Sequence, residues 1–265
     1  DPRSGLTGRG ITLLRQYKNL LVCRFDLQGY IVVDKSAEEL KIIDSVYGPT
    51  GSSAGYGISV DDSTGVVFLA FPDGIVVYDL DALAVVTSIE MDARGVTHDD
   101  DSIYTVDVST DIDGNLFYRF VEIARADYAI TYHGLIKNLD IVITRGLPVA
   151  MIADEKFIYI GGQSKTGTPG SVFNSPVAII DRFTKKVING SINSENLAPG
   201  RQVRDLILSD RRLLVGGGSS SGPNALGGFT AHNTSINYNP DADRVTMPIK
   251  SADDSRYGWF VQSEE

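Results

Sequence analysis

The chain has 265 residues, and its 34 acidic residues outnumber its 24 basic ones, which gives a formal net charge of −10. That charge repels phosphate backbones and makes general nucleic-acid binding unfavourable. No run of 18 apolar residues is present, so a membrane-spanning helix is excluded. The 27 glycines and 10 prolines are spread among short apolar segments, a composition typical of many short strands joined by tight turns.

Short apolar segments recur along the chain in one order, with a period of about 50 residues. Each unit opens with Arg or Tyr, then Gly, then an apolar residue, and Gln replaces Gly in the last copy. We call these segments the starts: Arg9-Gly10-Ile11, Tyr56-Gly57-Ile58, Arg94-Gly95-Val96, Arg145-Gly146-Leu147 and Arg201-Gln202-Val203. An apolar strand follows each start after a polar turn, at residues 19–22, 66–69, 102–105, 157–160 and 212–215.

A hairpin completes the unit, because a strand ending in Asp turns over four to six residues into a second apolar strand. We expect the Asp carboxylate to accept hydrogen bonds from backbone N–H groups one or two residues on and so close the turn. Clear copies run from 31–34 into 40–43, from 76–79 into 84–86 and from 178–181 into 186–188, with a looser copy from 120–123 into 128–130. The fifth unit offers only residues 244–247 as a last strand.

Four strands in each unit predict an all-β fold, a β-propeller of about five four-stranded antiparallel blades that forms a single domain over residues 1–265. The expected blades are approximately 8–53, 54–92, 93–140, 141–195 and 196–250. Residues 251–265 contain a sixth start-like segment, Tyr257-Gly258-Trp259, and form either a closing strand or the start of a further blade. In the second case the chain is a fragment of a six- or seven-bladed propeller. A β-sandwich pair and a fibre-type β-solenoid are alternatives that do not explain the order of the repeat.

The hairpin resembles the YVTN-type propeller repeat, in which a Val-Ile-Asp strand turns through a polar segment into a Val-rich strand. The resemblance covers roughly residues 8 to 217 and is good in three units. It implies a propeller architecture and no particular activity, because YVTN-like propellers include surface-layer and other extracellular proteins as well as enzyme subunits.

The starts also predict a binding site. If the strand after each start is the innermost of its blade, the first residues of the starts surround one mouth of the central channel. These residues are Arg9, Tyr56, Arg94, Arg145 and Arg201. Guanidinium groups bind carboxylate, phosphate or sulfate through paired hydrogen bonds, so the ring would form a local anion site in an acidic protein. Alternatively, each Arg pairs with an acidic residue of the neighbouring blade and locks the ring.

The same mouth carries the longest expected connections, at residues 107–115, 161–175 and 216–227, and we interpret Gly216-Gly217-Gly218 as a linker. In the first connection Asp111, Asp113 and Asn115 alternate in a way that resembles the calcium loops of EF-hands and integrin-type propellers. The first position of that pattern is Ser109, and Phe120 replaces its terminal Glu, so a plain hairpin loop is the alternative. Apart from calcium, no cofactor is expected.

Catalytic motifs are lacking, because His98, His133 and His232 lie in no recognisable triad pattern. The run Asp99-Asp100-Asp101 after His98 is interpreted as a solvated turn. The single cysteine, Cys23, lies in an apolar run and is expected to be a small buried hydrophobe.

Together these features predict a non-enzymatic binding or assembly module. We expect it to dock a protein or glycan partner on its long-loop face as part of a larger assembly, with an extracellular surface layer or a virion tail as the favoured setting. The alternative function is a calcium-dependent propeller hydrolase, such as a lactonase.

Overall fold

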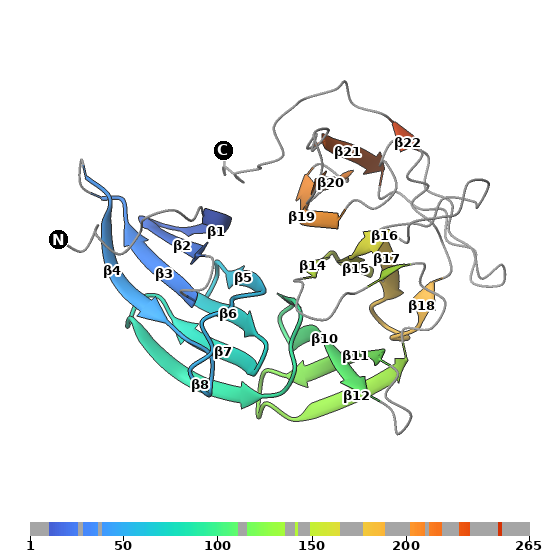
Figure 1. Ribbon diagram of the computed structural model, residues 1–265, viewed down its shortest axis with the longest axis horizontal. Coiled ribbons are helices and arrows are strands. Elements are labelled where there is room, and N and C mark those ends of the chain that lie inside the picture. The colour runs from blue at the N-terminus through green and yellow to red at the C-terminus, as the bar shows by residue number, and fades with distance from the viewer. Residues whose placement is uncertain are drawn as a thin grey trace. The chain divides into compact units, whose positions relative to one another are not determined.

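The structure is a computed structural model that describes residues 11–25, 29–36, 39–110, 116–135, 141–142, 149–164, 177–188, 202–209, 212–218, 228–233 and 249–250. Every helix or strand assigned within these ranges is a β-strand, and the strands form five sheets, four with four strands and one with six (Figure 1). The chain divides into two compact units, unit 1 with residues 1–97 and 261–265 and unit 2 with residues 98–260.

The first two sheets are antiparallel meanders in which spatial order equals chain order. The first contains β1 (Ile11–Tyr17), β2 (Leu20–Phe25), β3 (Gly29–Asp34) and β4 (Lys41–Val46). The second contains β5 (Gly57–Asp61), β6 (Val66–Phe71), β7 (Gly74–Asp79) and β8 (Ala84–Glu90). β4 and β8 are therefore the outermost strands of their sheets.

The next two sheets repeat this arrangement. The third contains β9 (Val96–His98), β10 (Ser102–Thr110), β11 (Leu116–Ala124) and β12 (Ile130–Leu135). The fourth contains β14 (Ala150–Ala153), β15 (Phe157–Gly161), β17 (Val177–Asp181) and β18 (Val187–Ile188). In the described part of the chain, all four meanders begin within a few residues of a predicted start, so the prediction of an all-β chain of four-stranded antiparallel repeats is confirmed.

The fifth sheet holds the last predicted unit together with two short extra strands. Its order is β13 (Ile141–Val142), β16 (Gln163–Ser164), β19 (Gln202–Ser209), β20 (Arg212–Gly218), β21 (Gly228–Asn233) and β22 (Ile249–Lys250). The last four strands follow chain order as in the other sheets, and β13 and β16 extend the edge beside β19.

Three local predictions are corrected. β10 continues through Thr110, so the connection to β11 is residues 111–115 and not 107–115. Gly216-Gly217-Gly218 is part of β20 and not a linker, because these glycines pair with β19 on one side and two of them with β21 on the other. The third strand of the fifth unit, β21, was missed because Gly228–Asn233 has a mixed polar and apolar pattern. Residues 244–247 lie outside the described residues.

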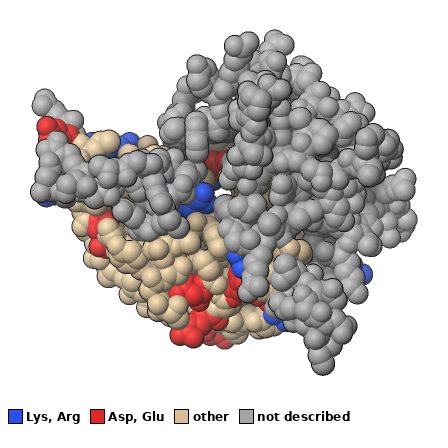
Figure 2. Space-filling model, viewed as in Figure 1, with Lys and Arg blue, Asp and Glu red and all other residues tan. Residues whose placement is uncertain are grey.

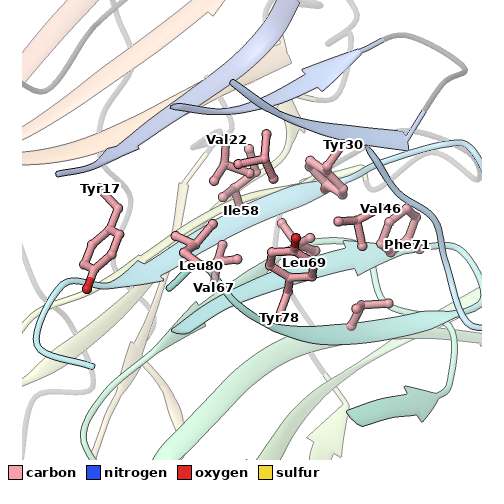
Figure 3. Close-up of a cluster of buried hydrophobic side chains, with 12 residues drawn as sticks. Tyr17, Val22, Tyr30, Val46, Ile58, Val67, Leu69, Phe71, Tyr78 and Leu80 are labelled. Atoms are coloured by element: carbon pink, nitrogen blue, oxygen red, sulfur yellow. The ribbon is translucent and has the colours of Figure 1, made fainter. Parts of the chain in front are cut away.

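The core of unit 1 lies between its two sheets. Side chains from the first sheet, such as Val22 and Tyr30, point toward Val67, Leu69 and Phe71 of the second (Figure 3). The middle strands β3 and β7 are buried along almost their whole length, since each is covered on both faces. This burial explains why the sequences of β3 and β7 are continuous apolar runs, in which apolar and polar residues do not alternate.

The core of unit 2 consists of two such layers. One lies between the third and fourth sheets and includes Tyr104, Phe120 and Ile158. The other lies between the fourth and fifth sheets and includes Tyr159 and Leu206. Unit 2 is therefore built by the same face-to-face packing of sheets as unit 1.

The three fully paired hairpins leading to β4, β8 and β12 share one irregularity. In each, the outer strand has one more residue than its partner: Ile43 in β4, Val86 in β8, and an extra residue at His133-Gly134 in β12. Such bulges increase the local twist of an edge strand and interrupt its flat row of hydrogen-bonding groups.

The hairpin aspartates close their turns as predicted, but they accept from N–H groups two and three residues on, where the prediction is one or two residues on. Oδ1 of Asp34 accepts a hydrogen bond from the backbone N–H of Ser36 at 2.8 Å. Oδ1 of Asp79 accepts from the N–H groups of Asp81 and Ala82, and Oδ1 of Asp181 accepts from the two equivalent N–H groups of its own turn. The carboxylate thus satisfies donors two and three residues on, which fixes the turn.

Candidate binding site

Two of the five predicted ring residues, Tyr56 and Arg94, lie in the described part of the chain, directly before β5 and two residues before β9. The Nη1 of Arg94 donates to the Tyr56 hydroxyl at 3.0 Å, and the guanidinium carbon lies 5.1 Å from the centre of the Tyr56 ring. The structure therefore brings the first residues of two successive starts into contact. Arg9, Arg145 and Arg201 lie outside the described residues, and their place in a ring stays a prediction.

Arg94 is held inside the protein and not displayed on its surface, since only 4% of the residue is exposed. Its Nη2 donates to Oδ2 of Asp92 at 2.6 Å. Arg24 lies nearby and donates to the Tyr56 carbonyl oxygen at 3.3 Å. Burial raises the pKa of Tyr56, and the Arg94 charge opposes part of that rise. The result is a compact cluster of two guanidinium groups, a neutral phenol and a carboxylate.

The glycine of the start signal has a structural cause. A Cβ on Gly57 would lie 2.9 Å from the backbone nitrogen of Val96 and 3.1 Å from the Cα of Gly95. The Tyr30 hydroxyl also accepts a hydrogen bond from the Gly57 N–H at 2.9 Å and lies 2.7 Å from the Gly57 carbonyl oxygen. Adjacent starts therefore meet backbone to backbone, and a side chain at this point has no room.

A ten-residue connection, residues 47–56, joins β4 to β5 at the same end of the sheets as the starts. Asp73, in the turn between β6 and β7, anchors it: its Oδ2 accepts from the Thr50 N–H at 2.8 Å, the Thr50 hydroxyl at 2.5 Å and the Ser52 N–H at 3.3 Å. The loop also donates from Gly48 N–H to the Ser52 carbonyl oxygen at 2.8 Å. We call this segment the anchored loop. It displays Tyr47, which is 51% exposed.

In unit 2 a polar network joins the third sheet to the turn after β17. Lys185, in that turn, donates to the Tyr104 hydroxyl at 2.9 Å and to Oε1 of Glu122 at 2.7 Å. The other oxygen of Glu122 lies 2.7 Å from Nε2 of His133, and Ser102 donates to Oε1 at 2.9 Å. Burial by itself would lower the pKa of Lys185, but its hydrogen bonds to Glu122 and Tyr104 outweigh burial and raise it. Lys185 therefore stays an ammonium group at neutral pH.

Asp99 extends this network. Its Oδ2 accepts from the Tyr104 hydroxyl and from Nε of Arg182, each at 2.6 Å, while its Oδ1 accepts two backbone N–H groups of its own turn. The assignment of the run after His98 to a turn is confirmed, but the interpretation as solvated is wrong for Asp99, whose side chain is nearly buried. Sequence reasoning missed this contact, although the cations that follow Asp181 were its signal.

The predicted calcium residues Asp111, Asp113 and Asn115 lie outside the described residues, so calcium stays a prediction. Within the ranges that are described, no group of three or more His, Cys, Asp or Glu side chains could hold a metal ion. In that same part of the chain we find no helix of the length and apolar character that a membrane crossing needs.

Comparison with known proteins identifies the fold. No protein-family model matches the sequence, and no curated protein matches it. Among solved structures, the β-propeller domain of Myceliophteria thermophila Cps50 (Swd1) matches with a TM-score of 0.56 and 13% identity, over 90% of this chain and 70% of that one. A chain of a nidogen/laminin complex matches with a TM-score of 0.56 and 12% identity, over 90% of this chain and 85% of that one.

These similarities and the repeated four-stranded meanders define the class of protein: the chain is a β-propeller, as the sequence predicts. At identities this low the comparison establishes the fold alone.

Proposed function

We propose that this propeller is a non-enzymatic binding or assembly module, which docks a protein or glycan partner on the face that carries the starts and the long connections. The observation that carries the proposal is the anchored loop. Ten residues without regular structure are held by three hydrogen bonds to one oxygen of Asp73 and present an exposed tyrosine. Long loops fixed on a rigid scaffold are the usual place of recognition.

The physical advantage of such a loop is preorganisation. A loop that is already ordered loses little conformational freedom when a partner binds, so more of the contact energy appears as affinity. Tyrosine suits this position because it offers a large rigid surface for protein or sugar contacts together with a hydroxyl group. The predicted ring residues outside the described part of the chain, Arg9, Arg145 and Arg201, would add an anion-binding element on the same face, whereas Arg94 is buried and paired with Asp92. One of the solved structures similar to this chain is a complex of nidogen with laminin, and it therefore contains a protein bound to its partner.

Co-purification from the native host, quantified by mass spectrometry, and a glycan array test this proposal with three variants. Tyr47→Ala removes the displayed ring, and Asp73→Ala releases the loop. The control is Tyr132→Ala, which removes a tyrosine that is exposed to a similar extent on β12. We expect the first two variants to lose the partner or glycan that the wild type retains, and the control to keep it. A wild-type protein that remains a solitary monomer and binds no glycan would overturn the proposal.

The extracellular surface layer or virion tail is part of the same proposal. Fractionation of the producing cells, with an antibody against this chain, tests it directly. Recovery of the protein in the surface or particle fraction supports the setting, and recovery only in the soluble cell extract contradicts it.

The alternative of a calcium-dependent hydrolase has a separate test. Calorimetric titration with calcium, together with esterase and lactonase assays, checks the predicted loop of Asp111, Asp113 and Asn115. Saturable binding that Asp113→Ala abolishes would support the metal site, and turnover would be needed in addition to support the enzyme.

A further inference from the structure

The second sheet lies in a stretch of the sequence that contains no cation. Between Lys41 and Arg94 there is no Lys, Arg or His, whereas eight carboxylates occur. They are Asp44, Asp61, Asp62, Asp73, Asp79, Asp81, Glu90 and Asp92. On the face seen in Figure 2, acidic side chains cover more of the described surface than basic ones. The whole of β5–β8 therefore has a strongly negative local composition, even within an acidic protein.

The outermost strand of this sheet, β8, exposes apolar side chains to solvent. Val85 is 55% exposed and Val86 is 54% exposed, and Leu83 just before the strand is also exposed. Among the described residues β8 pairs only with β7, so within that part of the chain its other side offers a row of unpaired backbone N–H and C=O groups. The bulge at Val86 interrupts that row, and Thr87–Glu90 is the regular stretch beyond it.

Carboxylates stand at both ends of this edge. Asp79 is the last residue of β7, Asp81 lies in the turn that leads into β8, and Glu90 is the exposed last residue of β8. Among the described residues, Lys18 is the cation that contacts Asp81, at 3.0 Å, and more than half of each side chain in that pair is exposed. An exposed ion pair of this kind is weak and is screened by salt, so a partner's cation can compete for Asp81.

The outer strands of the neighbouring sheets differ in charge. β4 begins with an exposed lysine, Lys41, and in β12 the ring of Tyr132 lies against the guanidinium of Arg119 at 4.1 Å. Among the outer strands of the first three sheets, as far as the chain is described, β8 alone combines exposed valines with an unpaired edge and neighbouring charges in the sequence that are all carboxylates. Its charge and shape complement a strand that carries basic and apolar side chains.

We propose that the outer edge of β8 binds an extended protein segment in which basic and apolar residues alternate. The segment adds to the second sheet as a further antiparallel strand, a known mode of peptide recognition in which backbone hydrogen bonds provide affinity and side chains provide specificity. Its apolar side chains cover Val85 and Val86, and its cations approach Asp81 and Glu90. This edge is a different surface from the face that carries the anchored loop.

The probe is a fluorescent hexapeptide of alternating Lys and Val, with a Glu and Val hexapeptide as its acidic counterpart. Fluorescence anisotropy is expected to show saturable binding of the basic peptide, weakened as NaCl rises from about 50 mM to about 500 mM. The variant Val85→Lys with Glu90→Lys should lose about tenfold or more in affinity, because it removes apolar contact and reverses the charge. Leu40→Lys with Glu39→Lys, the same exchange beside β4, is the control and should lose less than about twofold.

Strand addition is separated from simple charge attraction by N-methylated peptides. Methyl groups on the amide nitrogens of one peptide edge should abolish binding, whereas methyl groups on the other edge should leave it intact, because only one edge can pair with β8. Hydrogen exchange on the complex should show new protection in Thr87–Glu90. Tyr47→Ala and Asp73→Ala should bind the peptide normally, which distinguishes this proposal from the proposed function.

Four outcomes would overturn the proposal. They are an absence of saturable binding up to about 1 mM peptide, equal binding of the acidic peptide, an equal loss in the β4 control, and equal binding of both N-methylated peptides. Circular dichroism and a thermal melt establish that the double variants are folded before the affinities are compared.

Discussion

At the residue scale, the glycine of the start signal is required because neighbouring innermost strands approach each other closely. Gly57→Ala would place a methyl group against the backbone of Gly95 and Val96, which cannot move aside as a flexible side chain can. We expect a loss of about 1–3 kcal/mol in the free energy of unfolding, as for other overpacked sites. Urea denaturation measures it.

Gly134→Ala is the matched control, since a Cβ at Gly134 in β12 would meet nothing within 4 Å. Its effect should stay within about 0.5 kcal/mol. If the two variants lose equal amounts of unfolding free energy, Gly57 is required for the flexibility of the chain and not because the starts approach each other closely.

The turns before β8, β12 and β18 hold a left-handed residue at the same position, with φ of 51° at Leu83, 60° at Tyr128 and 57° at Lys185. An L-residue with a branched or long side chain is strained there, whereas Asn tolerates this conformation. Leu83→Asn should therefore raise the free energy of unfolding by about 0.5–1 kcal/mol.

Lys185→Asn is the informative counterpart to Leu83→Asn. It relieves the same strain but removes the ammonium group that contacts Tyr104 and Glu122. We expect net destabilisation, measured by the same urea transition. Stabilisation by both substitutions would mean that the polar network of unit 2 contributes little.

Cys23 illustrates how burial controls reactivity. The thiol lies in β2 among apolar side chains, and burial raises its pKa to about 11. Because the thiolate is the reactive form, labelling by iodoacetamide at pH 8 should be slow in the native protein and fast in denaturant. Rapid native labelling would contradict the buried position of β2.

At the element scale, the hairpins show which features a sequence pattern can predict. Asp at the end of the third strand predicts the turn, because its carboxylate satisfies nearby backbone donors whatever the rest of the fold does. The bulges of the outer strands leave no comparable signal. An extra residue such as Val86 looks like any other strand residue, and only the pairing with β7 shows that it is unmatched.

The polar network of unit 2 makes the stability of the third and fourth sheets depend on pH. Burial alone would raise the pKa of Glu122, but hydrogen bonds from Lys185, His133 and Ser102 outweigh it and lower the pKa below its usual 4.5. The pKa of Asp99 is lowered in the same sense, with burial again outweighed by hydrogen bonds. A carboxyl group whose pKa is lower in the folded than in the unfolded protein stabilises the fold at any pH above its unfolded pKa. This stabilisation is lost as the pH falls through the pKa of the group in the folded protein.

Lys185 affects stability at the alkaline end of the pH range. Its pKa is raised by folding, so it stabilises the folded protein below pH 10.5, and this stabilisation is lost as the pH rises through the pKa of Lys185 in the folded protein. With Glu122→Gln, the free energy of unfolding should therefore decrease less steeply below pH 4.5 and less steeply above pH 10.5 than in the wild type. Glu155→Gln, at an exposed site in the same unit, should leave the profile unchanged. Urea midpoints across the pH range measure both, and identical profiles for the two variants would contradict the role of Glu122.

At the scale of the whole molecule, periodicity predicts the propeller because each repeat must bury its apolar face against a neighbour. The candidate site is harder to predict from the same pattern. The equivalent positions of Tyr56 and Arg94 in the repeat predict that the two residues lie together, as they do. The repeat does not show that Arg94 is already paired with Asp92, because that pairing depends on how the connection before β9 folds. The network around Asp99 depends on a contact with Arg182, 83 residues away in the sequence, so the run after His98 does not by itself show that Asp99 is paired.

The separation of the hydrophobic clusters also predicts how the molecule unfolds. The cluster around Leu69 lies wholly in unit 1, and those around Ile158 and Tyr159 lie wholly in unit 2. In repeat proteins stability is largely a sum over units and their nearest neighbours, so a cavity weakens its own surroundings most. Leu69→Ala and Ile158→Ala each remove a fully buried side chain and should each cost about 2–5 kcal/mol locally.

Native-state hydrogen exchange at low denaturant tests this expectation. Leu69→Ala should speed exchange of the amides in β6 and β7 while those in β10 and β15 change less, and Ile158→Ala should show the reverse. If both variants accelerate all four strands equally, the chain opens as one cooperative unit, and the division of the core into separate clusters does not govern its stability. A graded response would instead mean that each sheet relies mainly on the sheets packed against its own faces, as expected when four-stranded repeats bury their apolar side chains against their neighbours.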